Sequence, residues 1–289
     1  MSNTIYRGGG SGTVLWQEPQ GLRLSSTNNV YVPTADVTGV GTLYWTTEIS
    51  GGTGIVTGYN GSTIASKAIQ QKSIAVSMTS GKIKNVYYDY DADALALGAD
   101  WTNDTTPSET IADEQGAKVL SSDHTKLYLG VVRADGSNTI ADSKAKPWVV
   151  NTYNRMPRPL FTSNSGSHLY TSTYREWNAG TGSVRLELLL PDKTYPVSLT
   201  LSVQGTIVAN GLMQTNMTVD ATTTSGTGFL LTNEIIFHLS TSHIFTQDMI
   251  KLLDIDTVGI GYHYVAVVEQ GQGAGGTWDI SAMQGLMAR

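Results

Sequence analysis

Cysteine is absent from the 289 residues, which excludes disulfide bonds, thiolate metal sites and a cysteine nucleophile. Charge is scarce too: Asp, Glu, Lys and Arg make up 15% of the chain, and the net charge is −6. A nucleic-acid-binding surface needs basic side chains gathered on one face. The closest grouping here is the sparse set Lys144, Lys146, Arg155 and Arg158. The composition therefore argues against a nucleic-acid partner, and an acidic chain gains nothing from an anionic membrane surface.

Long hydrophobic runs are missing as well. No stretch approaches the roughly 18 apolar residues that a membrane span needs, so we expect no membrane insertion. The opening MSNTIYRGGGSG has no apolar stretch, so we expect no secretion signal there. Threonine, serine, glycine and asparagine fill the chain instead. Threonine suits a pleated sheet, whereas glycine and asparagine suit tight turns.

Apolar and polar residues alternate in many short segments. Examples are TLYWTTEI at 42–49 and YPVSLTLSVQG at 195–205. A period of two is typical of half-buried strands. Turn signals such as Asp135–Gly136 separate the segments, and this dipeptide favours a hairpin. The pattern predicts an all-β protein with two antiparallel β-sandwich domains of jelly-roll-like form.

The predicted organisation has three parts: an N-terminal anchoring arm at 1–21, a β-domain at 22–157, and a jelly-roll-like β-domain at 158–289. The segment WVVNTYNRMPRPLF (148–161) lies at the boundary. Its two prolines push the residues before them out of the helical region. We therefore predict an extended, semi-rigid linker that fixes the angle between the two domains.

Two short helices are predicted among the strands. The first covers SETIADEQGAK at 108–118, with Ser108 as its N-cap. The second covers QDMIKLL at 247–253, with Thr246 as its N-cap. Serine and threonine are favoured at this position because their hydroxyl oxygens accept hydrogen bonds from free backbone N–H groups.

Three blocks stand in order along the chain: VYVPTADVTGVGTLYWT (30–46), SKAKPWVVNTYNRMPRPLF (143–161), and the stretch from GIGYHYVAVVEQ to the terminal SAMQGLMAR (259–289). Together they resemble a widespread group of tailed-bacteriophage virion proteins. The first block is similar to the group's opening strand, and the second to its N-x-Y-N-R-x-P-R-P-L strand and linker. The resemblance implies a minor structural protein on the particle surface, commonly a homotrimer, assembled in the host cytoplasm. It carries over no catalytic residue and no cofactor, so we expect neither.

The arm and the boundary segment hold the candidate assembly residues. Val14, Leu15 and Trp16 form a small apolar patch after a glycine-rich stretch. We predict that this patch anchors the arm in another subunit or another virion protein. We also predict that Arg155 and Arg158 pair with carboxylates of a neighbouring domain or subunit, because arginine suits such interface ion pairs.

Aromatic side chains are the candidates for host-glycan contact, because their faces stack on sugar rings. The first candidate is Trp278 in GAGGTWD, where the flanking glycines predict an exposed loop. The second is Trp177. The alternative for each is burial in a sandwich core, where large aromatics are common.

Acidic residues suggest two further kinds of chemistry. DYDADALALGAD at 89–100 spaces its aspartates like a calcium loop, but Ala94 stands where that loop needs glycine and Asp100 where it prefers glutamate. We favour a polar turn and no metal site.

A glycosidase needs two facing carboxylates. Nothing in the sequence pairs any two of the candidates Glu176, Glu187, Glu234 and Glu269.

The sequence thus predicts a virion protein without enzymatic activity, a short fibre or knob with weak glycan contacts that add through multivalency. Attachment to the head is preferred, because no heptad repeats are present to build a long shaft. The alternatives are a small tail fibre or receptor-binding protein, a stand-alone carbohydrate-binding module, and a depolymerase.

Overall fold

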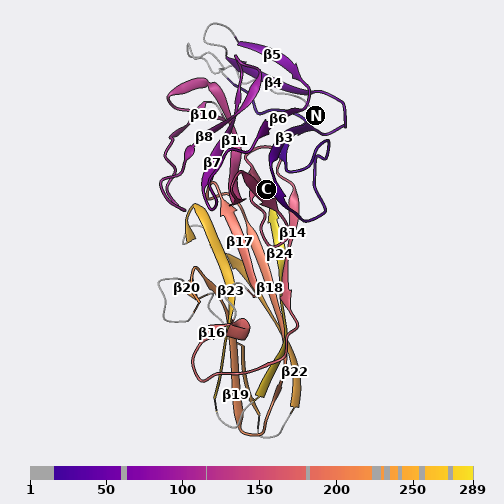
Figure 1. Cartoon of the computed structure of the whole chain (residues 1–289), viewed down its shortest axis with the longest axis vertical. Helices are drawn as coiled ribbons and strands as arrows, with labels where there is room; N and C mark the ends of the chain where they lie inside the picture. The colour runs from indigo at the N-terminus through magenta and orange to yellow at the C-terminus, as the bar shows by residue number, and fades with distance from the viewer. Residues whose placement is uncertain are drawn as a thin grey trace.

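The computed structural model describes residues 16–59, 64–114, 116–179, 183–222, 229–230, 235–239, 243–253, 258–272 and 276–288. The described chain is almost entirely β-strand, with antiparallel pairing between neighbours, so the predicted all-β class is confirmed. Figure 1 shows an elongated molecule, with the N-terminal half at one end and the C-terminal half at the other. No helix within the described ranges is long and apolar enough to cross a membrane.

The N-terminal half contains a three-stranded sheet in the order β1-β3-β6, an eight-stranded sheet and the hairpin β4-β5. The longest strand, β11, pairs with β7, β10, β12 and β13 and organises the larger sheet. The strands are β1 (Leu22–Ser25), β2 (Val37–Val40), β3 (Thr42–Thr47), β4 (Gly54–Tyr59), β5 (Ile64–Ile69), β6 (Lys72–Ala75), β7 (Ile83–Asp89), β8 (Ala94–Asp100), β9 (Ile111–Glu114), β10 (Ala117–Leu120), β11 (Asp123–Gly136), β12 (Thr139–Asp142) and β13 (Val149–Asn151).

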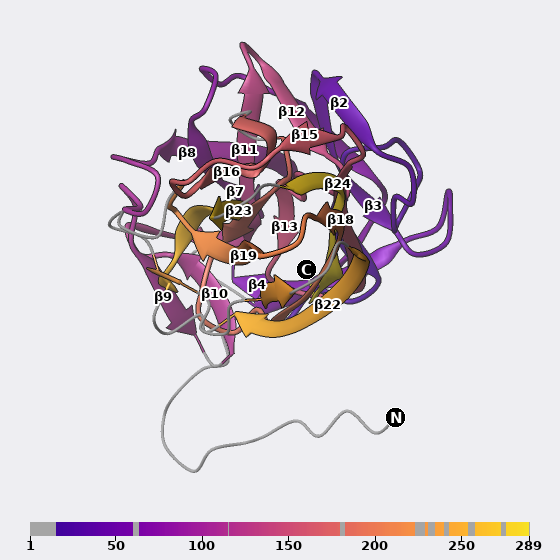
Figure 2. The same cartoon turned by 90° about the horizontal axis from the view of Figure 1, so that it is seen from below.

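A jelly roll forms the C-terminal half. Its strands are β14 (Pro157–Asn164), β17 (Arg185–Leu190), β18 (Val197–Ile207), β19 (Gly211–Val219), β21 (Ile235–Leu239), β22 (His243–Leu253), β23 (Gly261–Gln272) and β24 (Gly276–Ala288). They form two sheets, in the orders β14-β24-β18-β22 and β17-β23-β19-β21. Numbered one to eight along the chain, these are 1-8-3-6 and 2-7-4-5, the jelly-roll arrangement of two Greek keys. Figure 2 shows the two sheets facing each other, seen nearly end-on.

Short strands extend the edges of the two jelly-roll sheets. β15 (His168–Leu169) pairs with β24, and β16 (Arg175–Glu176) pairs with β23. β20 (Phe229–Leu230) pairs with β19. A single 3-10 turn, η1 (Trp177–Ala179), follows β16.

One hydrophobic core runs through both halves of the chain. Tyr128, Val131 and Trp148 of the N-terminal half belong to the same buried cluster as the interior of the jelly roll. The other face of the N-terminal sheet packs in a second cluster, which includes Leu43 and Trp45. The eight-stranded sheet is therefore covered on both faces, once by its own small sheet and once by the jelly roll.

Both helix predictions are wrong. Residues 108–118 contain β9 and the start of β10, which pair across a turn at Gly116 (φ 96°). Residues 247–253 belong to β22, which pairs with β18 along its whole length. In each case the pairing of the segment with a neighbouring strand outweighs its local helix propensity, which is a weak constraint by comparison.

The predicted linker is extended, but part of it is a strand. β13 ends at Asn151 and β14 begins at Pro157, so only residues 152–156 connect the two halves. Pro157 and Pro159 lie in β14, which is an edge strand of its sheet. Proline cannot donate a ladder hydrogen bond, and an edge strand tolerates this because one of its two sides needs no donor.

Candidate functional site

The two boundary arginines connect the halves of one chain. Arg155 Nη2 lies 3.1 Å from Asp192 Oδ2, and its guanidinium carbon lies 3.9 Å from the ring centre of Tyr195. Arg158 is 2% exposed, although it lies on the jelly-roll strand β14. Its guanidinium donates to the carbonyl oxygens of Pro33 and Asp142 in the N-terminal half. Both arginines thus fix the angle between the two halves.

The predicted exposure of Trp278 is wrong. Trp278 and Trp177 are both 0% exposed, and their ring centres lie 5.1 Å apart inside the jelly roll. Trp278 lies on β24, where its inward position follows from pairing with β18. Stacking on a sugar requires an accessible ring face. Neither tryptophan offers one, so both are corrected from glycan contacts to core residues.

The predicted anchoring patch is corrected in part. Trp16 is 0% exposed and packs edge-on against Tyr90, with ring centres 5.6 Å apart. Its indole N–H donates to the carbonyl oxygen of His124 at 2.9 Å. Trp16 is therefore part of the core of its own chain and is not a free anchor. Val14 and Leu15 lie outside the described residues.

The residues of the calcium-like stretch form the β7–β8 hairpin. Asp89 accepts hydrogen bonds from the backbone N–H groups of Asp91 and Ala92, which is a turn-stabilising contact. Asp93 pairs with Lys72 at 2.7 Å and accepts from the Tyr88 hydroxyl at 2.7 Å. The favoured interpretation, a polar turn between two strands, is confirmed.

A buried charged cluster escaped the sequence analysis. Glu269 on β23 is 0% exposed and pairs with Arg175 Nε at 2.8 Å and His168 Nε2 at 2.6 Å. Burial would lower the pKa of His168, but its hydrogen bonds to Glu269 and to the Gly166 carbonyl and the Glu269 charge raise it overall. Glu269 lies 101 positions from His168 and 94 from Arg175 along the chain, so no local pattern could reveal the cluster. The three residues hold the segment that carries β15 and β16 over the far end of the jelly roll.

The other carboxylates considered for glycosidase chemistry also have cationic partners. Glu176 pairs with Arg185, and Glu187 pairs with Lys146 at 3.1 Å. Glu234 lies outside the described residues. Within the described ranges, no group of three His, Cys, Asp or Glu side chains is placed to hold a metal ion.

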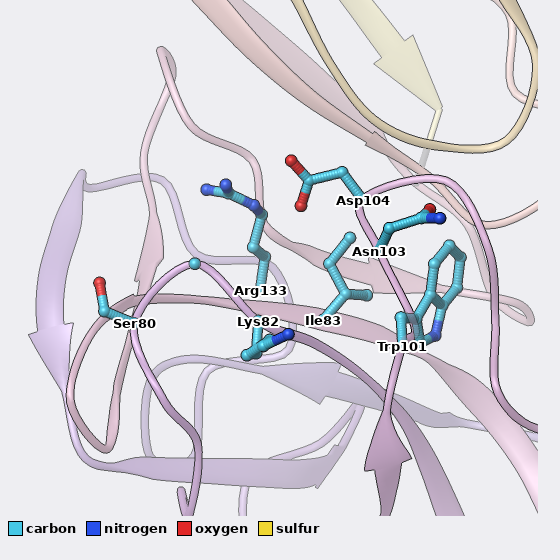
Figure 3. Close-up of a pocket in the computed structure, with 8 residues that line it drawn as sticks. Ser80, Lys82, Ile83, Trp101, Asn103, Asp104 and Arg133 are labelled. Carbon is cyan, nitrogen blue, oxygen red and sulfur yellow. The ribbon is translucent and has the colours of Figure 1, made fainter.

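A small pocket of the N-terminal half, here called the junction pocket, lies beside its contact with Tyr262 of the C-terminal half. Its volume is about 240 Å³, and its lining includes Lys82, Arg133, Asp104 and Trp101 (Figure 3). The Arg133 guanidinium carbon stands 3.7 Å from the ring centre of Tyr262 and 4.6 Å from that of Trp148. Its Nε is buried without a hydrogen-bond partner among the described residues. The two rings thus hold a cation at the edge of the pocket.

The most extensive candidate surface is the outer face of the sheet β14-β24-β18-β22. Six of the eleven large hydrophobic side chains that are exposed in the described residues lie on this face: Phe161, Ile244, Ile250, Leu252, Ile280 and Leu286. The outward residues of β18 are small or uncharged, namely Ser198, Thr200, Ser202, Gln204 and Thr206. Charges are few among the outward positions described on the four strands: Asp248 on β22, and Asp279 at a bulge in β24.

The strand register divides this face into ridges and a trough. Ser198 is the partner of Leu286 on one side and of Leu252 on the other, and Thr200 is the partner of Gln284 and Ile250. Short serine and threonine side chains therefore run between two rows of larger ones. A groove of about 460 Å³ lies on the same face, lined by Ser198 and Thr200 and by Lys144, Pro159, Leu160, Phe161, Gln284, Gly285 and Leu286.

Together, the topology and the surface define a jelly-roll protein with one apolar, almost uncharged sheet face. No protein-family model matches the chain, and no curated protein matches it. Solved structures similar to it include infectious bursal disease virus strain Gx, at 11% identity and a TM-score of 0.31, covering 96% of this chain and 74% of that one. The VP2 subviral particle of the same virus gives 12% identity and a TM-score of 0.33, with coverages of 95% and 73%.

The insecticidal delta-endotoxin Cry8Ea1 of Bacillus thuringiensis is similar at 5% identity, with a TM-score of 0.22 and coverages of 95% and 53%. TM-scores this far below 0.5 say nothing about a shared function. The fold class of this chain follows from its own strand order.

Proposed function

We propose that this protein is a structural component of a tailed-phage particle, a short surface fibre or knob that works by assembling with other proteins. The observation that carries the proposal is the outer face of the β14-β24-β18-β22 sheet, with six exposed large hydrophobic side chains. Large apolar side chains gathered on one exposed face mark a protein-contact surface. The three sequence blocks that resemble phage virion proteins supply the setting and imply a homotrimer, and the lack of heptad repeats for a long shaft favours attachment to the head.

The core that runs through both halves suits this role, because it makes the elongated molecule one stiff unit. The arm is part of the proposal, with Val14 and Leu15 as its anchoring residues. Trp16 must be kept in any truncation, since it belongs to the core. A version that lacks residues 1–15 should fold and fail to join particles. If that version still decorates particles, the arm is not the anchor.

Mass spectrometry of purified particles from an infected host tests the main proposal. We expect the chain in the particles, and gold-labelled antibody against it should mark the particle surface. Particles that retain infectivity and structure but contain no copy of the chain would overturn the proposal. The position of the label also separates head from tail attachment.

Glycan adhesion is the second candidate function, and the junction pocket favours it. The cations Lys82 and Arg133 beside Asp104 suit a sugar that carries both a carboxylate and hydroxyl groups, because guanidinium groups bind carboxylates through paired hydrogen bonds. Oligosaccharides ending in glucuronic or sialic acid are the probes, with neutral oligosaccharides as their control. Lys82→Ala should weaken binding about tenfold, whereas Lys126→Ala, a change of equal charge outside the pocket lining, should not. Binding that ignores Lys82 would exclude this site.

A further inference from the structure

We infer that the partner of the apolar sheet face is a second copy of this chain, and that the β22 ridge of one copy seats in the groove of the next. Here the β22 ridge means Ile250 and Leu252, and the groove is the one lined by Ser198, Thr200 and Leu286. The inference deepens the proposed assembly function and rests on it, because it names the partner for the same surface.

The shape of the face supports a second copy of this chain as its partner. Ile250 and Leu252 are 73% and 75% exposed and stand in a row on the edge strand. The groove crosses β14, β24 and β18, and its lining combines the short side chains of Ser198 and Thr200 with apolar ones that include Phe161 and Leu286. One copy therefore carries both a protruding apolar ridge and a recess suited to receive it, so the surface complements itself.

The charges beside the ridge and beside the groove are also opposite in sign. Asp248 stands two residues from Ile250 on the ridge strand, and Lys144 lies at the rim of the groove. A second copy oriented so that Asp248 faces Lys144 pairs these opposite charges at the edge of the contact. The remaining charge described on the face, Asp279, accepts a hydrogen bond from the Ser167 hydroxyl, so this orientation leaves no buried charge without a partner, which would otherwise be costly.

The area of the face is adequate for a stable contact. Four strands at a spacing of about 4.8 Å, with a rise of about 3.3 Å per residue along an 11-residue strand, cover roughly 700 Å². A standard interface buries about 800 Å² on each partner. Sheets also pack face to face at about 10 Å through apolar side chains, which is the chemistry that this face offers.

The two edge strands of the sheet, β22 and β14, differ in how readily they can associate with a partner. β22 pairs only with β18 among the described strands, so no described strand covers its other edge. β14, at the opposite edge, carries Pro157 and Pro159, which remove backbone donors. An open edge beside an exposed apolar ridge invites association unless a partner covers it.

The test is the mass of the purified full-length chain in solution. We expect an oligomer by light scattering and by analytical ultracentrifugation at about 10–100 μM. Ile250→Ser and Leu252→Ser together should raise the dissociation constant at least tenfold and give monomers. The matched control is Ile49→Ser with Leu169→Ser, two hydrophobic residues as exposed as the ridge but off the face. The control variant should keep the parent mass.

Because all four positions are exposed, each variant should fold, and a circular dichroism spectrum like that of the parent verifies it. A monomeric parent chain at 100 μM would overturn the inference, as would an oligomer unchanged by the ridge substitutions. If the parent is monomeric but the ridge variant is lost from particles, the face binds a different virion protein. Particle mass spectrometry reports on the proposed function separately, so the two failures are distinguishable.

Discussion

At the scale of single residues, burial decides what the tryptophans do. The glycines around Trp278 suggest a loop, yet the residue lies on β24 with its ring in the core. The same is true of Trp177, whose ring packs against those of Trp278 and His168. Residue type alone does not separate a surface platform from a core side chain, since aromatic rings serve both uses.

Trp278→Ala should therefore act on stability. We expect the free energy of unfolding to fall by about 3–5 kcal/mol, as for other buried large aromatics. Urea denaturation followed by circular dichroism measures the loss. Leu169→Ala, at a residue that is 71% exposed, serves as the control and should change stability by less than about 0.5 kcal/mol. If the Trp278→Ala protein is as stable as its parent, Trp278 is an exposed residue and not a core residue.

The buried cluster around Glu269 predicts a pH dependence. Because the folded state raises the pKa of His168, the folded chain holds a proton that the unfolded chain has released above about pH 6.5. This stabilisation is fully present below that pH and is lost as the pH rises through the folded-state pKa. In His168→Gln the amide can still donate to Glu269 but cannot titrate. The difference in unfolding free energy between parent and variant should therefore shrink from pH 6 to pH 9. A difference that does not change with pH contradicts this prediction.

At the scale of elements, alternation predicted strands well where the polar positions are clear, as in β3 and β18. It failed for β22, because Met249, Leu252 and Leu253 in QDMIKLL have the i, i+3, i+4 spacing of a helix face, whereas Ile250 and Leu252 have the i, i+2 spacing of a strand. The paired residues of β18 lie from 36 positions (Ile207 and His243) to 56 positions (Val197 and Leu253) earlier in the chain, and this ladder settles the choice. Outward hydrophobic residues on β22 also break the expected polar pattern, and our proposed self-contact accounts for them.

Two glycines at the start of β23 allow a test of how closely the two halves pack against each other. Gly261 has φ of 117°, and a Cβ there would lie 2.2 Å from the carbonyl oxygen of Asp104. Gly259 has φ of 90° with open space around it. Backbone strain should cost Gly259→Ala about 1–3 kcal/mol, and Gly261→Ala should cost more, because the loop at 101–106 must also move. Chemical denaturation of both variants gives the comparison. Equal costs would mean that the contact is easily relaxed.

At the scale of the whole molecule, the shared core makes the two halves depend on each other. Trp148 of the N-terminal half donates its indole N–H to the Glu187 carbonyl at 3.2 Å, and Lys118 pairs with Asp192 at 3.1 Å. Arg155 and Arg158 add the contacts described above. Two independent domains joined by a linker would share far fewer such contacts. The two predicted β-domains are therefore joined by a common core as well as by the linker.

We expect the full chain to unfold in one cooperative transition. Tryptophan fluorescence and far-ultraviolet circular dichroism should give coincident curves in denaturant, which is the criterion for two-state behaviour. Trp148→Ala should lower the single midpoint for the whole chain, because it opens a cavity in the common core. Two transitions at separate denaturant concentrations would show that the halves are independent.

The sequence by itself determined the all-β class, many of the strands and the extended form of the boundary segment, because period-two alternation and proline geometry are local properties. The tertiary structure alone decided that Trp16, Trp177 and Trp278 are core residues, that Glu269 meets His168 and Arg175, and that β22 presents its ridge outward. Those outcomes depend on which strands pair across long stretches of chain. Burial and ion pairing are set by that pairing, and neighbours along the sequence do not encode it.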